Sequence, residues 1–97
     1  MVILDYLGRR WTLRIGWELR GGPLAFRELQ RRCEIGSPNI LALRLREGLE
    51  LGVFARDGAS QYQLTRSGKR LATILGDLDG WAKGWAKSVD RAGRRTG

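Results

Sequence analysis

The stretch that decides the fold runs from Phe26 to Gly52 and reads FRELQRRCEIGSPNILALRLREGLELG. Residues 26–33 predict a short helix with one apolar side, formed by Phe26, Leu29 and Cys33. Gly36-Ser37-Pro38 then supplies a loop glycine, an N-cap serine and a proline at the first helical position, which together start a second helix. A short helix, a tight turn and a longer helix in this order predict a helix-turn-helix motif.

The second helix is expected over residues 37–51, with Gly52 as its end. At about 100° per residue, its core side is expected to carry Leu41, Leu45 and Leu49. The outward side is then expected to hold Asn39, Leu43 and Arg46, with Ala42 at the flank. In a helix-turn-helix, the outward side of this helix is the one that contacts bases.

The candidate base-contacting residues therefore come from this helix, and they are Ser37, Pro38, Asn39, Ala42, Leu43 and Arg46. Arg46 can bind guanine O6 and N7, but it can equally pair with Glu50 or contact a phosphate. Asn39 suits adenine and Leu43 suits a thymine methyl group. Ser37 suits a phosphate, although it also serves as an ordinary helix cap.

Two short strands are expected after this helix, at Val53–Arg56 and Gln61–Leu64. Asp57-Gly-Ala-Ser60 between them is a hairpin signal. A hairpin in this position is a wing, expected over residues 53–64 and in contact with the DNA backbone. The residues expected to neutralise phosphates, from the wing and the short helix, are Arg27, Arg31, Arg32 and Arg56.

Two flanking helices complete the chain, one from Trp11 to Leu19 and one capped by Thr65. The first is apolar on two sides, so its second side is expected to meet either a second subunit or the last helix. The last helix carries an apolar stripe at spacings of three and four. The expected dimer interface is Leu13, Trp17, Leu71, Ile74, Leu78, Trp81 and Trp85.

The composition fits a folded protein with a polyanionic partner. The 97 residues carry a formal net charge of +8 with 42% hydrophobic residues, which favours a nucleic acid over other partners. We expect one domain over residues 1–89 and a basic, flexible tail over 90–97. No apolar run predicts a membrane span or a signal peptide, so a cytoplasmic, nucleoid-associated location without membrane partners is expected.

The chain has no histidine and one cysteine, Cys33. These counts exclude a Ser-His-Asp triad and a Cys/His zinc site, and no cofactor-binding motif is present. We therefore expect neither an enzyme nor a metal or cofactor site. Cys33 lies on the apolar side of its helix and is expected to be a buried thiol.

Several stretches, in this order, resemble the HxlR family of winged helix-turn-helix regulators, which is close to the MarR type. They are Gly8-Arg-Arg-Trp-Thr-Leu13, Glu18-Leu-Arg-Gly-Gly-Pro23, Phe26-Arg-Glu-Leu29, Ser37-Pro-Asn-Ile-Leu41, Leu45-Arg-Glu47 and Tyr62-Gln-Leu-Thr-Arg-Ser-Gly-Lys-Arg-Leu71. The resemblance implies a dimer in which the second helix of the motif enters the major groove. It also implies a wing that reaches the flanking backbone, and first and last helices that build the dimer.

The sequence departs from the family pattern at four points. No cysteine precedes the first helix, Ala25 stands where a basic residue is usual, Gly48 stands where leucine is usual, and the wing is short. The missing cysteine argues against a redox sensor of the kind that some family members are.

The predicted fold is mainly helical with a small β-hairpin wing, an α+β winged helix-turn-helix with flanking dimerisation helices. The predicted function is a homodimeric transcriptional regulator that binds a pseudo-palindromic operator in double-stranded DNA. The alternative is a winged-helix module that binds proteins and has no sequence-specific DNA contact. A small-molecule effector between the tryptophans is a further hypothesis, with no class of compound indicated.

Overall fold

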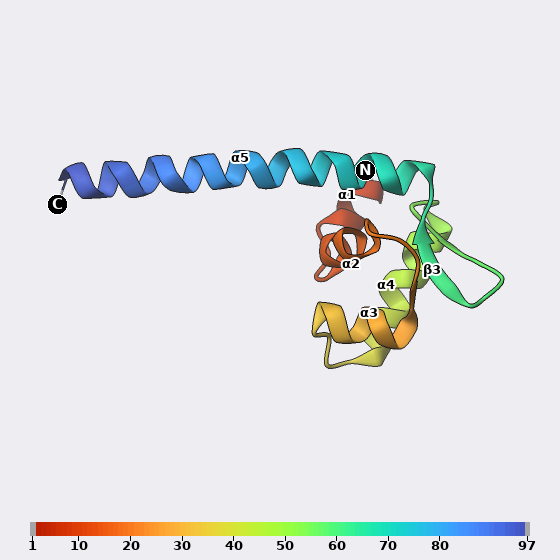
Figure 1. Cartoon of the computed structure of the whole chain (residues 1–97). Coiled ribbons are helices and arrows are strands. Elements are labelled where there is room, and N and C mark those ends of the chain that lie inside the picture. Colours follow the sequence, from red (N-terminus) through yellow and green to blue (C-terminus); the bar gives the residue numbers. More distant parts are fainter. Residues whose placement is uncertain (1, 97) are drawn as a thin grey trace.

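The structure is a computed structural model that describes residues 2–96, with side chains described for residues 2–91. Figure 1 shows a compact body with one long C-terminal helix lying across it and projecting well beyond it. The molecule measures 55 × 27 × 26 Å along its principal axes. In chain order the elements are α1 (Val2–Leu7), α2 (Thr12–Leu19), β1 (Leu24–Ala25), α3 (Phe26–Cys33), α4 (Pro38–Glu50), β2 (Phe54–Arg56), β3 (Gln61–Leu64) and α5 (Arg66–Thr96).

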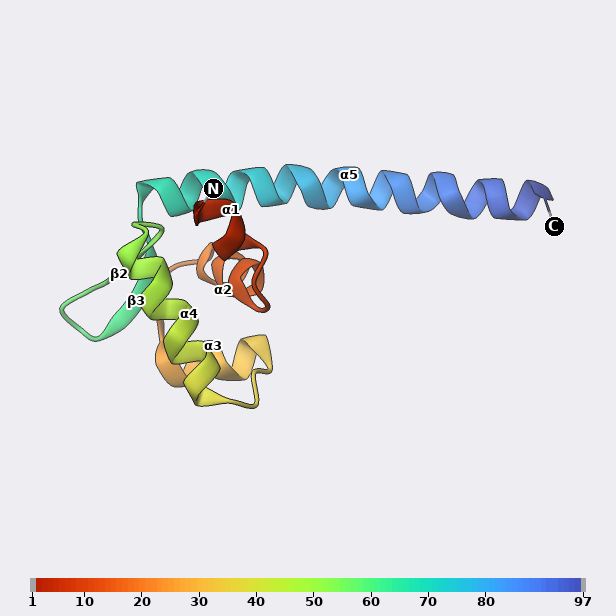
Figure 2. The same cartoon turned by 180° about the vertical axis from the view of Figure 1, so that it is seen from behind.

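The fold is the predicted winged helix: mostly helical, with a small antiparallel sheet. The core is formed by apolar residues from α1 to α4, the segment after α4 and the sheet, and its members include Ile15, Leu29, Leu41, Leu45 and Phe54. Helix α3 and the start of α4 lie at the end of the body away from α5, and α4 runs from there back toward the hairpin (Figures 1 and 2). The turn of the helix-turn-helix is therefore distant from the long helix.

The helix-turn-helix has the predicted bounds, and its caps explain why. Glu34 ends α3 in the left-handed conformation, with φ of 59°. Ser37 starts α4, because its hydroxyl oxygen accepts a hydrogen bond from the Ile40 amide at 3.3 Å. Pro38 occupies the first helical position, where its missing N–H costs nothing.

At the C-terminal end of α4, the residue that faces the core differs from the predicted one. Leu41, Leu45 and Gly48 are buried, whereas Leu49 is 37% exposed. The prediction that Leu49 faces the core was wrong. A Cβ atom at position 48 would overlap the Phe54 ring and lie 2.7 Å from the Tyr6 hydroxyl oxygen. The Phe54 ring thus fills the space that a leucine at 48 would need, and no rotation of α4 toward Leu49 is required.

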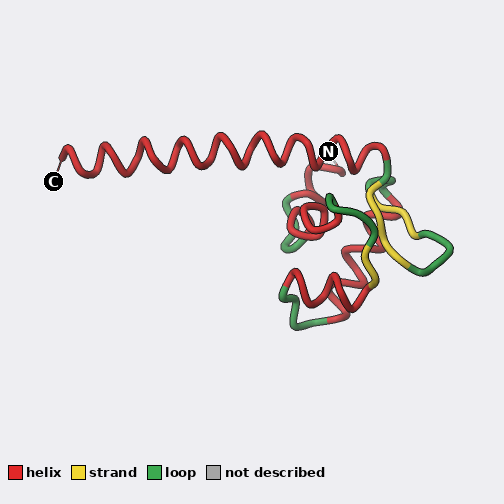
Figure 3. The backbone as a smooth tube through the Cα atoms, viewed as in Figure 1, coloured by secondary structure: helices red, strands yellow, loops and turns green. Residues whose placement is uncertain are grey.

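The wing is part of a three-stranded sheet with strand order β1-β3-β2. Both pairings are antiparallel, and Tyr62 on β3 is opposite Leu24 and Arg56. The hairpin strands β2 and β3 were predicted, but the short strand β1 was not. The Asp57 carboxylate shapes the hairpin turn by accepting hydrogen bonds from the Ala59 and Gln61 amides at 2.9 and 3.0 Å. The turn projects from the body at the tip of the two strands, as the loop-coloured segment of Figure 3 shows.

The two ends of the chain differ from the prediction. Helix α1 was not predicted, and Trp11 precedes α2 in a left-handed conformation with φ of 78° instead of starting the helix. The residues expected to form a flexible tail, 90–97, continue α5 as far as Thr96, while Gly97 lies outside the described residues. Thr65 caps α5 as predicted, because its hydroxyl accepts from the Gly68 amide at 3.1 Å.

Candidate nucleic-acid interface

The outward side of α4 is exposed along its whole length. Every residue predicted to contact bases is classed as exposed: Ser37, Pro38, Asn39, Ala42, Leu43 and Arg46. Among the residues that the structure describes, Arg46 makes no hydrogen bond or ion pair, so the alternative pairing with Glu50 is absent. Its guanidinium is therefore available to an external acceptor.

One flank of α4, which carries Arg44 and Glu47, is hydrogen-bonded to the N-terminal part of the chain. The sequence did not predict these contacts. The Tyr6 hydroxyl donates to the Arg44 carbonyl oxygen at 2.7 Å. The Arg44 guanidinium donates to the Arg10 carbonyl oxygen at 3.0 Å and to Glu47 at 2.7 Å. Burial raises the pKa of Tyr6 far above its usual value, with the Glu47 carboxylate adding to the effect. Tyr6 is therefore a neutral donor at physiological pH.

The basic residues of α3 are partly neutralised within the helix. Arg31 and Arg32 both pair with Glu28, and Arg32 does so at 2.9 Å. Hydrogen bonds from these two arginines lower the pKa of Glu28 to about 2. Arg27 is exposed and makes no such contact in the described part of the chain. Of the three α3 arginines predicted to meet phosphates, Arg27 is the one with a fully available charge.

The wing carries Arg56 at its exposed edge. The Arg56 guanidinium lies 5.5 Å from the centre of the ring of Tyr62, its partner on the neighbouring strand β3, a cation–π arrangement across the hairpin. Tyr62 is itself half-buried against the core. Arg56 is thus a positive charge at the side of the wing, in a defined position relative to α4.

The flanking helices present an apolar stripe to solvent. On α5 the exposed members are Ile74, Leu78, Trp81, Trp85 and Val89, while Leu71 is half-buried. The Trp81 and Trp85 rings stack with centroids 6.5 Å apart. On α2, Leu13 and Trp17 line a groove of about 310 Å³ with Leu75, Leu78 and Ala82 of α5. The second apolar side of α2 therefore meets the last helix of the same chain, one of the two predicted alternatives.

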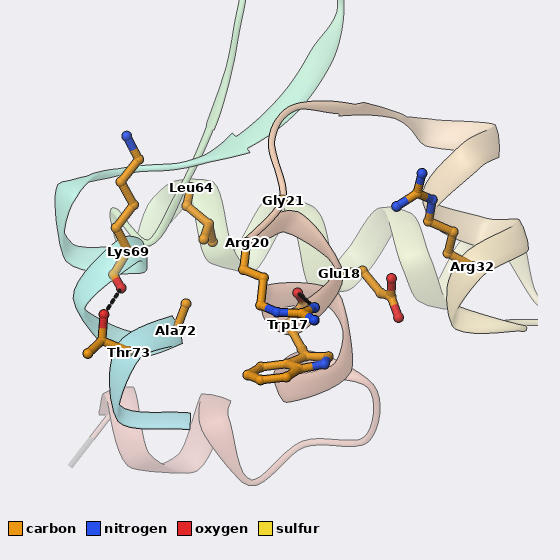
Figure 4. Close-up of a pocket in the computed structure, with 9 residues that line it drawn as sticks. All are labelled: Trp17, Glu18, Arg20, Gly21, Arg32, Leu64, Lys69, Ala72 and Thr73. Atoms are coloured by element: carbon orange, nitrogen blue, oxygen red, sulfur yellow. Dashed lines mark hydrogen bonds between the residues drawn. The ribbon is translucent and has the colours of Figure 1, made fainter. Parts of the chain in front are cut away.

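A second and wider cleft lies between α2, α3 and the start of α5. Figure 4 shows its lining, which includes Trp17, Arg20, Lys69 and Thr73. The Arg20 guanidinium lies 3.8 Å from the centre of the Trp17 ring and donates to the Trp17 carbonyl oxygen at 2.9 Å. Of the four tryptophans, Trp17 lines this cleft, whereas Trp81 and Trp85 lie exposed on α5. The predicted effector site between the tryptophans stays a prediction.

The single cysteine is buried, as predicted. Burial raises the pKa of the Cys33 thiol, and the Glu18 carboxylate raises it further. Because the thiolate is the reactive form, both effects make this thiol less reactive than an exposed one.

The described residues hold neither a metal-binding cluster nor a membrane-spanning helix. Residues 2–96 contain no group of three or more His, Cys, Asp or Glu side chains placed to hold a metal ion. Within the same range, none of the helices combines the length and apolar character that crossing a membrane requires.

The comparisons with known proteins agree on one kind of protein. Residues 6–90 match the family described as HxlR-like helix-turn-helix. The chain is 38% identical over 89 residues to the uncharacterised HTH-type transcriptional regulator YvaP of Bacillus subtilis strain 168, covering 84% of this chain and 82% of the relative.

Solved structures agree with the sequence relatives. Quinone-bound YodB of B. subtilis superimposes with a TM-score of 0.78 at 29% identity, covering 86% of this chain and 93% of that one. A protein of Enterococcus faecalis V583, described as a transcriptional regulator of the MarR family, gives a TM-score of 0.81 at 27% identity. That match covers 93% of this chain and 87% of the other.

Proposed function

Because the chain belongs to the HxlR-like helix-turn-helix family of transcriptional regulators, we propose that it is a homodimer that binds a pseudo-palindromic operator through α4. Family membership supplies the general role, regulation of transcription through DNA. The dimer, the operator symmetry and the contacting residues are our proposal. We also propose that it acts in the cytoplasm, at the nucleoid.

One observation carries the DNA-binding role: the second helix of a helix-turn-helix is exposed along one side and presents there an arginine, Arg46, that has no partner among the described residues. In this motif the second helix lies in the major groove, and its N-terminal residues contact base edges. We therefore propose that Asn39, Leu43 and Arg46 contact bases and that Ser37, Pro38 and Ala42 approach the backbone or the groove wall. Arg46 suits guanine, Asn39 adenine and Leu43 a thymine methyl group.

The surrounding charge supports phosphate binding on either side of α4. Arg27 and Arg56 have available guanidinium groups at the start of α3 and on the wing. Arg31 and Arg32 share the charge of Glu28, so we assign them a smaller part in phosphate binding. A net charge of +8 favours DNA over a neutral protein partner.

The apolar stripe of α5 supports the dimer. Ile74, Leu78, Trp81, Trp85 and Val89 together expose more apolar surface than scattered single residues on a monomer would. We propose that the α5 helices of two subunits pair through this stripe, with Leu71 at its edge and Leu13 and Trp17 beneath it. A two-fold axis through this pair would relate two α4 helices, and we propose that they bind half-sites about 34 Å apart.

Selection of bound duplexes from random DNA by the purified protein tests this function. The expected result is a pseudo-palindromic site with half-sites one helical turn apart and strongly salt-dependent binding. Arg46→Ala is expected to relax the preference at one base position of each half-site. Arg56→Ala is expected to weaken selected and random duplexes alike and to reduce the salt slope by about 1.

Two results would change the proposal. Equal loss on selected and random duplexes for Arg46→Ala would reassign this residue to phosphate contact. No salt-dependent binding to any duplex would contradict the DNA-binding role and favour a winged-helix module that binds proteins.

A further inference from the structure

Helix α4 is held to the body differently on its two flanks. Its inner edge is apolar, with Leu41, Leu45 and Gly48 buried. On one flank, Ala42 and Leu49 are exposed and make no polar contact in the described chain. On the other flank, Arg44 and Glu47 join α4 to the segment between α1 and α2. The apolar edge alone would permit small rotations of α4, since hydrophobic contact has no preferred direction.

The second flank contains four polar contacts within one turn of helix, three to residues 6–10 and one between Arg44 and Glu47 within α4. The Arg44 guanidinium donates to the Arg10 carbonyl oxygen at 3.0 Å and to the Glu47 carboxylate at 2.7 Å. The Arg44 backbone carbonyl accepts from Tyr6 of α1 at 2.7 Å. The other oxygen of Glu47 lies 3.5 Å from the Arg9 guanidinium. Side chain and main chain of one α4 residue are thus both bonded to residues 6–10.

The contact between Arg44 and Glu47 is partly shielded from water, whereas the bond to the Arg10 carbonyl lies at an exposed position. The Arg44 side chain is 11% exposed and that of Glu47 is 22% exposed. In contrast, Arg9 is 53% exposed. A hydrogen bond to a charged group is stronger in such surroundings than on an open surface, and its loss leaves partners unsatisfied. The geometry of these bonds therefore restricts the rotation of α4 about its own axis.

We propose that Arg44 is a positioning residue for DNA recognition: by joining α4 to the segment 6–10, it fixes which α4 side chains point into the groove. The role rests on the proposed function, since it presupposes that α4 contacts bases. Arg44 itself is directed toward the body and makes no base contact. Its removal rotates the outward edge, so Asn39 and Arg46 meet bases less well while phosphate contacts from Arg27 and Arg56 persist.

The test compares Arg44→Met with a matched control, Arg14→Met. Arg14 makes the same two kinds of bond on another helix: it donates to the Arg32 carbonyl oxygen at 3.0 Å and pairs with Glu18 at 3.1 Å. Methionine keeps much of the aliphatic stem and removes the guanidinium in both variants. The probes are the duplex selected by the wild-type protein from random DNA and a scrambled duplex of the same length and composition. Affinities are measured for both at several salt concentrations.

Arg44→Met is expected to reduce the ratio of selected to scrambled affinity about tenfold, because at least one base contact per half-site is lost. Its affinity for the scrambled duplex and its salt slope are expected to stay unchanged. Arg14→Met is expected to keep the wild-type ratio. Equal loss of the ratio in both variants, or equal loss of affinity on both duplexes for Arg44→Met, would overturn the positioning role.

Arg44→Lys gives a second measurement that does not depend on the folding of Arg44→Met. Lysine keeps a charge beside Glu47 but lacks the fork that lets one side chain reach Glu47 and the Arg10 carbonyl in fixed geometry. An intermediate ratio is expected, and a wild-type ratio would contradict the proposal. If the wild-type protein selects no duplex, the proposed function itself fails and the positioning role falls with it.

Discussion

The body of the molecule and the distal part of α5, residues 81–91, bury their apolar side chains very differently. In the body, Leu29 and Leu41 are fully buried by the same chain. In distal α5, Trp81 and Trp85 are 65% and 55% exposed, and the helix runs free of the body in Figure 2. Isolated helices are only marginally stable in water. The body thus carries its own core, whereas the distal helix needs a second surface to cover it.

Leu41→Ala tests the body's side of this contrast and has the largest expected effect. Leu41 is buried in the centre of the inner edge of α4. Its truncation is expected to lower the free energy of unfolding by about 2–5 kcal/mol, measured by urea denaturation at fixed protein concentration. Leu43→Ala, on the exposed side of the same helix, is the control and is expected to change stability by less than about 0.5 kcal/mol. Similar values for the two variants would contradict the assignment of the α4 faces.

Trp85→Ala tests the distal helix. Trp85 lies on the exposed stripe and stacks on Trp81, so its loss is expected to weaken self-association and leave the body folded. A central interface tryptophan is worth about 2 kcal/mol or more, which corresponds to a roughly 30-fold rise in the dissociation constant. Sedimentation equilibrium measures it. Lys83→Ala on another side of α5 is the control, and an unchanged dissociation constant for Trp85→Ala would place the interface elsewhere.

Gly48 in the body and Gly80 in α5 test the same difference in packing. Side chains of the body lie next to Gly48, whereas the space beside Gly80 is open. A Cβ at Gly48 would overlap the Phe54 ring, whereas a Cβ at Gly80 would meet nothing within 4 Å. Gly48→Ala is therefore expected to cost about 1–3 kcal/mol through overpacking. Gly80→Ala is expected to gain up to about 1 kcal/mol through helix propensity. Thermal unfolding of both variants measures the difference, and effects of the same sign would show that packing at 48 is not limiting.

The smallest expected effect concerns the titration of the Glu28 carboxyl of α3 at low pH. Arg31 and Arg32 lower the pKa of Glu28 to about 2, from a usual value of about 4.5. Because the folded-state pKa is depressed, the stabilisation is present above the usual pKa and is lost as the pH falls toward 2. A carbon-detected NMR titration of the Glu28 carboxyl is expected to show this low midpoint. Replacing Arg31 and Arg32 with glutamine is expected to return it to the usual range, and a normal midpoint in the wild type would disprove the pairing.

The sequence was sufficient to predict the helix-turn-helix, the hairpin and the outward side of α4. Those features depend on local signals: the Ser37 cap, the Asp57 turn and the 3.6-residue period of the leucines. Strand β1 could not be predicted because two residues carry no period, and its pairing with β3 depends on contacts distant in sequence. Helix α1 was missed for a similar reason, since Tyr6 is its single buried residue.

The site was predicted less completely than the fold. Exposure of Asn39, Leu43 and Arg46 follows from helical periodicity, whichever segment packs on the inner side. The bonds of Arg44 to Tyr6 and Arg10 depend on where the chain before α2 lies in space, which no local pattern specifies. Leu49 was misplaced because periodicity treats glycine as a gap, while the ring of Phe54 occupies that gap.

The fit between Gly48 and Phe54 also limits how this sequence can diverge. A larger residue at 48 requires a smaller residue at 54 and a shift of the Tyr6 hydroxyl as well. A smaller residue at 54 beside an unchanged Gly48 leaves a hole next to Tyr6. Either replacement made alone gives a less stable protein. The two positions are therefore expected to covary among related regulators. Related sequences are expected to acquire the smaller residue at position 54 first and the larger residue at position 48 second. This order requires that the free energy of unfolding supplied by the rest of the core exceeds the loss caused by the first replacement.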